Sequence, residues 1–172
     1  MAVLSDSDIM AWLEKGSLRI EGYNESNLTP NGYDVTIDEI LIPSTGKRIS
    51  DGVASIPPGC WFVVATKEYL VLPPRLVGEI WIRTTWARRG VLASFGRIDA
   101  GFNGNLTFSA FNASESPLEA PIGDRFAQVV FSELLSPPKK TYEQRSGNYH
   151  KQRGITLAPR SRPSRKNPSG KP

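Results

Sequence analysis

The sequence predicts an all-β fold with a short N-terminal helix. Short runs of β-branched and aromatic residues follow one another along most of the chain, and Pro and Gly residues separate them. A chain of 172 residues has the length of one domain and can bury one core. Many short strands at close spacing, with few helical stretches, favour an antiparallel β barrel or sandwich.

The helix is expected directly after Ser5, a residue type that often caps helices. Asp6 and Asp8 follow in the first turn, apolar residues then recur at helical spacing, and Gly16 is expected to end the helix. The run over Leu106–Phe111 alternates as a strand does. One face carries Leu106, Phe108 and Ala110, and the other carries Thr107, Ser109 and Phe111. Strands are expected over Tyr33–Ile37, Cys60–Thr66, Val77–Ile82, Val91–Phe95, Leu106–Phe111 and Phe126–Phe131.

The positive charge of the chain is concentrated at its C-terminus. The net charge is +4, but residues 155–172 hold five Lys and Arg residues and no acid, so the rest of the chain carries −1. This basic segment is rich in Pro and Ser, which predicts a flexible, solvated tail after a folded domain over residues 1–154. Nucleic acid is therefore not expected as a partner.

Membrane association is not expected. The N-terminus lacks a signal-peptide pattern, and no apolar run approaches the length that crosses a bilayer. These features favour a cytoplasmic protein without a membrane partner.

The chemistry is expected between Gly78 and Asn112. The basic, hydroxyl-rich turn Arg83–Gly90 suits phosphate oxygens, because guanidinium groups donate paired charge-assisted hydrogen bonds and a glycine lets backbone N–H groups approach. Asp99 lies in the next tight turn, where a carboxylate could hold a water or a sugar hydroxyl. The two turns together predict a nucleotide site.

The chain resembles the superfamily of dUTP diphosphatases (dUTPases) and dCTP deaminases from about Leu4 to Ile155. Each matching segment alone is a weak signal. All of them occur in the same order as in the superfamily, and together they are a strong signal. The segments are Leu4–Ile9, Leu28–Val35, Lys67–Pro73, Arg83–Gly90, Ile98–Gly104 and Gly123–Gln128. The resemblance implies a distorted β barrel of the jelly-roll type, a homotrimer with active sites between subunits, and a nucleoside triphosphate substrate that carries Mg²⁺.

The two branches of this superfamily differ in the strand after Asp99. Deaminases of this type use a glutamate there to move protons, whereas dUTPases commonly carry a serine, and this chain has Ser109. Glu115 and Glu119 follow in an expected loop and offer no substitute. The resemblance thus favours hydrolysis of dUTP to dUMP and pyrophosphate.

The resemblance also assigns roles to single residues. Asp99 would bind the deoxyribose 3′-hydroxyl and orient the water that attacks the α-phosphorus, and Phe102 would exclude a ribose. Asp34 would help to hold Mg²⁺ through water. The residues expected to bind phosphates or to close over them are Arg83, Thr84, Thr85, Arg88, Gln128, Tyr149, Gln152 and Arg153.

Other features resemble the deaminases, so alternatives stay open. Arg83-Thr84-Thr85 is built like the deaminase turn, and Tyr149, Gln152 and Gly154 follow the deaminase pattern. A dCTP deaminase, or an enzyme with both activities, is the second interpretation. A nucleotide-binding protein without catalysis is the third.

Overall fold

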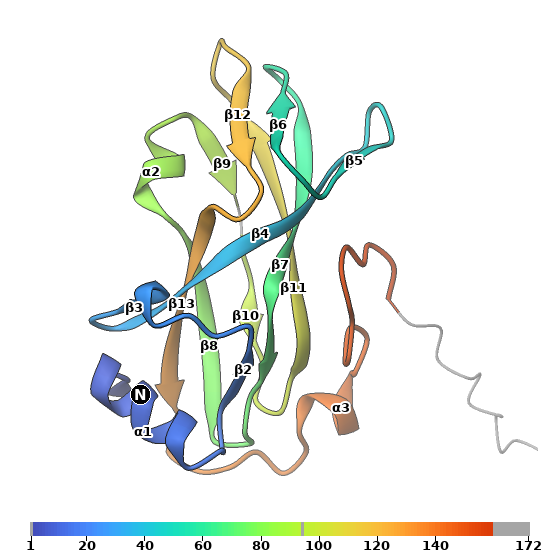
Figure 1. The fold of residues 1–172 in the computed structure, drawn as a ribbon. Helices are drawn as coiled ribbons and strands as arrows, with labels where there is room; N and C mark the ends of the chain where they lie inside the picture. Colours follow the sequence, from blue (N-terminus) through green and yellow to red (C-terminus); the bar gives the residue numbers. More distant parts are fainter. Residues whose placement is uncertain (1, 94, 160–172) are drawn as a thin grey trace, which may run out of the picture.

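The protein is built around an antiparallel sheet that curls into a distorted barrel of the jelly-roll type, which confirms the predicted fold class (Figure 1). This computed structural model describes residues 2–93 and 95–159. The main path of the sheet runs β10-β8-β13-β4-β7-β11-β9. Its strands are β4 (Gly32–Ile42), β7 (Trp61–Val71), β8 (Leu76–Ile82), β9 (Val91–Ala93), β10 (Arg97–Ile98), β11 (Asn103–Asn112) and β13 (Arg125–Glu133).

Shorter elements close the edges of this sheet. β1 pairs with β13, β2 with β7, and β3 and β5 with β4, whereas β6 and β12 form a separate two-stranded antiparallel sheet. These elements are β1 (Ala2–Val3), β2 (Arg19–Glu21), β3 (Leu28–Thr29), β5 (Lys47–Ile49), β6 (Val53–Ile56), β12 (Leu118–Pro121), α1 (Asp6–Glu14), α2 (Thr84–Ala87), α3 (Tyr142–Arg145) and the 3-10 turn η1 (Glu25–Asn27). In the described part of the chain, no helix has the length and apolar character that a membrane span requires.

The predicted N-terminal helix is present as α1. The N–H of Asp8 donates to the Ser5 hydroxyl at 3.2 Å, and the N–H of Ser5 donates to the Asp8 carboxylate at 3.0 Å, which completes a capping box. Gly16 follows the helix with φ at +66°, a conformation that glycine adopts without strain.

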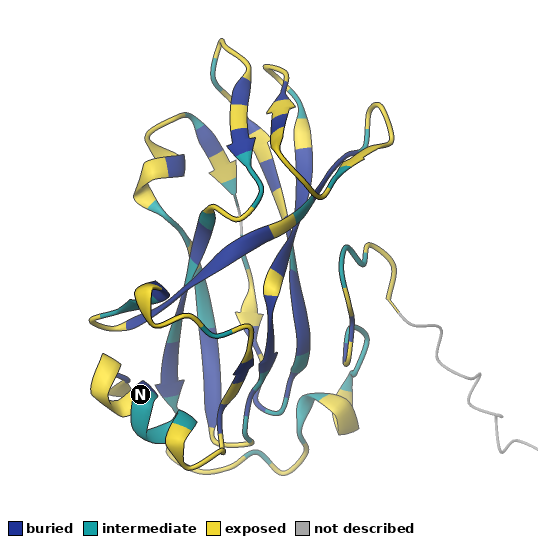
Figure 2. Cartoon of the chain, in the orientation of Figure 1, coloured by how far each residue is buried: buried dark blue, intermediate teal, exposed yellow. Residues whose placement is uncertain are grey.

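An aromatic cluster forms the centre of the core. Phe126 is fully buried and lies within 6.3 Å, between ring centroids, of Phe62, Trp86, Phe95 and Phe108. These residues come from β7, β11, β13, α2 and the segment between β9 and β10, so the cluster joins the sheet to the helix that follows β8. Figure 2 shows that buried residues predominate along β7, β11 and β13, with intermediate and exposed residues between them.

Two sequence predictions require correction. The expected strand over Val91–Phe95 ends at Ala93, and Phe95 instead packs inward against Phe108 at 4.8 Å between ring centroids. Glu119 does not lie in a loop: it belongs to β12 and pairs with Ser55 of β6.

The predicted basic tail is described only over residues 155–159, and its remainder lies outside the described residues.

A buried carboxylate links β4 to β7. Glu68 is 1% exposed, and its oxygens accept hydrogen bonds from the N–H of Thr36 at 2.8 Å and from the Thr36 hydroxyl at 2.6 Å. Burial raises the pKa of Glu68 above its usual 4.5, although the bonds from Thr36 oppose this shift. The folded state therefore holds a proton on Glu68 more tightly than the unfolded state.

This shift predicts how stability depends on pH. The contribution of a carboxyl whose folded pKa is raised is present below its unfolded pKa of 4.5 and is lost as the pH rises through the folded pKa. Glu68→Gln should therefore flatten the fall in the urea midpoint as the pH rises above 4.5. Glu115→Gln, which changes an exposed carboxylate in a turn, should keep the slope of the wild type. Equal slopes for all three proteins would contradict the prediction.

Candidate active site

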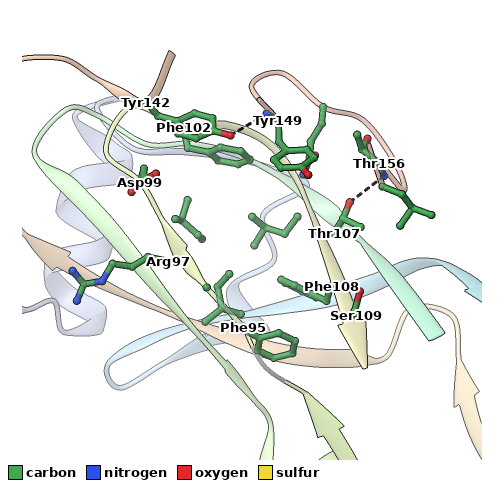
Figure 3. A pocket seen from close by; sticks show the side chains of 16 residues that line it. Phe95, Arg97, Asp99, Phe102, Thr107, Phe108, Ser109, Tyr142, Tyr149 and Thr156 are labelled. Carbon is green, nitrogen blue, oxygen red and sulfur yellow. Dashed lines mark hydrogen bonds between the residues drawn. The ribbon is translucent and has the colours of Figure 1, made fainter. Parts of the chain in front are cut away.

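A cavity of about 360 Å³ lies between the Asp99 turn, β11 and the C-terminal segment (Figure 3). The structure brings several of the predicted site residues together in its wall. They are Asp99, Phe102, Ser109, Tyr149 and Gln152. The cavity also has aromatic walls, so it combines apolar surface with a small set of polar groups, as ligand sites usually do.

The turn that carries Asp99 is fixed by strand pairing on one side. Ile98 in β10 lies opposite Gly78 in β8, and Asp99 follows directly. The C=O of Asp99 accepts a hydrogen bond from the N–H of Phe102 at 3.0 Å, which closes the turn. Gly101 has φ at +81°, and a Cβ at that position would lie 2.8 Å from the Cβ of Thr141. The turn thus leaves Asp99 exposed at the cavity and Phe102 buried in its wall.

Ser109 projects from the outward face of β11, as the predicted alternation requires. It is exposed, while its neighbours Phe108 and Ala110 are buried. Among the described residues that line the cavity, Asp99 is the only one with a carboxylate. The cavity therefore offers one acid to position a water or a hydroxyl, and no second acid beside Ser109.

The C-terminal segment runs beside the first half of β11. The N–H of Lys151 donates to the C=O of Asn103 at 2.7 Å, and Asn105 exchanges bonds with Gln152, whose C=O accepts from the Asn105 N–H at 3.1 Å. The side-chain amide of Gln152 also donates to the C=O of Asn105 at 2.6 Å. Arg153 turns away from the cavity, because its guanidinium stacks on Tyr69 at 3.8 Å and pairs with Glu21.

The Arg83 turn forms a second cluster around a buried carboxylate. Asp34 is 3% exposed, and its Oδ2 lies 2.9 Å from Nε of Arg83 and 3.5 Å from Nη1 of Arg125. Burial raises the pKa of Asp34, and the two guanidinium groups and Gln128 oppose that shift. Arg83 also donates to the C=O of Arg125 at 3.3 Å, so its orientation is set before any ligand binds.

The remaining predicted phosphate-binding residues surround this pair. Thr84 and Thr85 open α2 and Arg88 follows it, and all three are exposed. Trp86, in the same helix, anchors the turn by donating from its indole N–H to the C=O of Arg125 at 2.8 Å. Gln128 lies opposite Asp34 in the β13–β4 ladder. The turn therefore presents hydroxyls and an exposed cation on a rigid base.

A direct metal site does not fit this cluster. The Asp34 carboxylate already faces two guanidinium groups, which would repel a cation. Within residues 2–93 and 95–159, no group of three or more His, Cys, Asp and Glu side chains is arranged to hold a metal ion. A divalent ion at this cluster would have to arrive with the ligand.

The two clusters are far apart within one chain. Arg83 follows β8, whereas the Asp99 turn lies beside Gly78 near the start of that strand. Five residues of extended strand correspond to about 17 Å. Arg83 directly precedes α2 and Asp99 directly follows β10, and Figure 1 shows α2 and β10 at different heights along the barrel.

The sequence did not single out several residues that line the cavity. They are Phe95, Arg97, Tyr142, Thr156 and Leu157. Tyr142 carried a usable signal, because Thr141 and Gln144 have capping-box spacing and do form that box at the start of α3. The others depend on how the chain folds back, which residue patterns do not reveal.

Comparison with known proteins assigns the family. The model of a dCTP deaminase-like family matches residues 3–134. A dCTP deaminase of Pyrococcus horikoshii is 39% identical over 141 residues, which is 80% of this chain and 88% of that protein. A probable deoxyuridine 5′-triphosphate nucleotidohydrolase of Sulfolobus islandicus rod-shaped virus 1 is 33% identical over 159 residues, 91% of this chain and 98% of that protein.

Solved structures agree on the fold. The 2′-deoxycytidine 5′-triphosphate deaminase of Agrobacterium tumefaciens superposes with a TM-score of 0.64 at 18% identity, covering 75% of this chain and 47% of that chain. A mutant dUTPase from phage phi11 of S. aureus, described with a structural Mg(II) ion, gives a TM-score of 0.51 at 18% identity, covering 72% and 94%. The chain belongs to the dCTP deaminase-like family, within the dUTPase/dCTP deaminase superfamily.

The close approach of the C-terminal segment to β11 can be tested at Gly104. A Cβ there would lie 2.9 Å from Cζ of Phe102 and 3.1 Å from Cγ of Gln152, at a φ of +151°. Gly104→Ala should lower the free energy of unfolding by about 1–3 kcal/mol beyond the effect of strained backbone alone, and should expose Lys151 and Arg153 to trypsin.

Gly123→Ala is the matched control for this substitution. Gly123 also has a positive φ, +92°, but a Cβ there would meet nothing within 4 Å. Gly123→Ala should therefore lower the free energy of unfolding through backbone strain alone, and trypsin should not cleave the C-terminal segment faster than in the wild type. Identical urea midpoints and cleavage rates for the two variants would show that the segment does not pack against Gly104.

Proposed function

We propose that the chain is a dUTP diphosphatase, which hydrolyses dUTP to dUMP and pyrophosphate by attack of water on the α-phosphorus. The observation that carries this proposal is the number of carboxylate side chains that line the cavity. Of the described lining residues only Asp99 holds a carboxylate, and the exposed position on β11 carries Ser109. A single carboxylate can orient a water for phosphorus chemistry, whereas hydrolytic deamination needs a group that takes up and returns protons.

Asp99 and Phe102 supply the sugar side of the site. The Asp99 carboxylate accepts a hydrogen bond from the 3′-hydroxyl of the deoxyribose and another from the attacking water. Phe102 lies buried in the adjacent wall, so its ring leaves no room for a 2′-hydroxyl and selects against ribonucleotides. Tyr149 and Gln152 of the C-terminal segment cover the same cavity and limit the access of bulk water.

The Arg83 cluster supplies the phosphate side. Arg83 and the hydroxyls of Thr84 and Thr85 bind the triphosphate, supported by Arg88, and they stabilise the charge that moves onto the leaving pyrophosphate. Asp34 keeps the Arg83 guanidinium in place through their 2.9 Å contact. Mg²⁺ would be held mainly by phosphate oxygens of the substrate, where it would offset their negative charge, and Asp34 would contribute to holding it only through water.

Each site is assembled from more than one copy of the chain. Within one copy, about 17 Å of strand separates the Asp99 and Arg83 sides, which exceeds the distance from the sugar to the terminal phosphate of one nucleotide. A homotrimer with sites between subunits brings the two sides together. Arg153, paired with Glu21 in the described arrangement, joins the phosphates only if the C-terminal segment shifts.

A dCTP deaminase is the second candidate, and a specific observation favours it. The relative from Pyrococcus horikoshii, 39% identical, is named a dCTP deaminase. The turn Arg83-Thr84-Thr85 also resembles the deaminase form. Deamination in this chain would require another group to do the work of the glutamate that Ser109 replaces. Binding of nucleotide without turnover is the third candidate.

A side-by-side assay separates these functions. The purified protein with Mg²⁺ should release pyrophosphate from dUTP and no ammonia from dCTP. Asp99→Asn should lower kcat for dUTP by about a hundredfold or more, because the attacking water loses its acceptor. Asp51→Asn changes an exposed turn residue outside the cavity and should leave kcat unchanged.

Other outcomes assign the other functions. Ammonia from dCTP would identify a deaminase and would contradict the role given to Ser109. Tight binding of dUTP in calorimetry, without pyrophosphate or ammonia, would identify a binding protein.

A further inference from the structure

Tyr142 contacts both sides of the cavity (Figure 3). Its ring lies edge-on to Phe102, with 5.6 Å between the ring centroids. Its hydroxyl oxygen accepts a hydrogen bond from the backbone N–H of Tyr149 at 2.9 Å. Phe102 belongs to the Asp99 turn and Tyr149 to the C-terminal segment, so one side chain joins two parts of the wall that are distant in sequence.

The backbone around Tyr142 reinforces this connection. The N–H of Tyr142 donates to the C=O of Ala100 at 3.0 Å, within the Asp99 turn. The C=O of Tyr142 accepts from the N–H of Gly147 at 2.8 Å, where the chain turns into the C-terminal segment. The Thr141–Gln144 capping box holds α3 in place between these two bonds. The position of Tyr142 is therefore set by contacts on both sides.

The two side-chain contacts differ in kind and can be removed separately. The contact with Phe102 needs only the ring, because edge-to-face packing depends on aromatic surface. The contact with Tyr149 needs the hydroxyl, which can accept one hydrogen bond and donate another. Phenylalanine keeps the first contact and removes the second, whereas alanine removes both.

We propose that Tyr142 is a positioning residue that couples the C-terminal segment to the wall that receives the sugar. When the segment lies along β11, the bond from Tyr149 holds the Tyr142 ring against Phe102. When the segment leaves, that constraint is lost, and the fit around the sugar loosens with it. The sugar part of this inference rests on the proposed function, but the physical coupling does not.

Hydrogen exchange of the nucleotide-free protein tests the coupling directly. In Tyr142→Phe, the Tyr149 and Lys151 amides should exchange about tenfold faster than in the wild type, because a hydrogen bond that holds the segment is lost. The Phe102 amide, which donates to the C=O of Asp99, should also exchange faster, by about twofold, because the Tyr142 ring has lost the bond that holds it against Phe102. In Tyr142→Ala the Phe102 amide should exchange faster still.

Tyr23→Phe provides the matched control. Tyr23 is a partly buried tyrosine whose ring stacks on Tyr33 and whose hydroxyl contacts Met10, outside the cavity. Removing its hydroxyl should change none of these exchange rates. Wild-type exchange at Tyr149 in Tyr142→Phe would overturn the proposal. So would wild-type exchange at Phe102 in Tyr142→Ala, or in Tyr142→Leu if the alanine variant does not fold.

Kinetics with dUTP and UTP test the consequence for the sugar. Tyr142→Phe should raise KM for dUTP by about tenfold with little change in kcat, and should weaken the preference for dUTP over UTP. Tyr142→Ala should weaken that preference further. Equal preference in all variants would refute the effect on the sugar. If the wild type does not hydrolyse dUTP, the proposed function fails, while the exchange experiment still decides the coupling.

Discussion

The antiparallel pairing of β8 with its neighbours determines where each half of the proposed site lies. β8 pairs with β13 on one side and with β10 on the other. The chain passes from the end of β8 into the Arg83 turn, whereas the Asp99 turn follows β10 and is held beside the beginning of β8. The strand is too stiff and too long for both turns to meet in one copy. Association between copies is thus the condition under which our proposed chemistry can occur.

Each half of the proposed site has its own means of support. On the side proposed to bind phosphates, a buried carboxylate fixes a guanidinium, and Trp86 anchors the turn that carries the hydroxyls. On the side proposed to bind the sugar, the support comes from α3 and from the C-terminal segment, which contacts β11 through Gln152. The first half is rigid because its partners are buried in the barrel. The second depends on a segment that lies along the outside of the barrel, which suits a part that admits and releases substrate.

The sequence allowed the prediction of features that depend on local pattern. The capping box at Ser5 and the alternation around Ser109 are examples, because each follows from residues close in the chain. Strands as short as β3 and β10 exist only through their pairing, so no local pattern marks them. The same holds for the contact between Asp34 and Arg83 and for the place of Tyr142 between the Asp99 turn and Tyr149. These depend on which distant segments meet.

Subunit mixing tests most directly whether each site needs two copies. Arg83→Ala and Asp99→Asn proteins, each inactive alone, would be unfolded together and refolded, and mixed oligomers verified by native mass spectrometry. If Arg83 and Asp99 of one site come from different subunits, random mixing should restore about one quarter of wild-type dUTP hydrolysis, because a site then draws each residue intact half of the time. Mixed oligomers without any recovered activity would contradict the shared site.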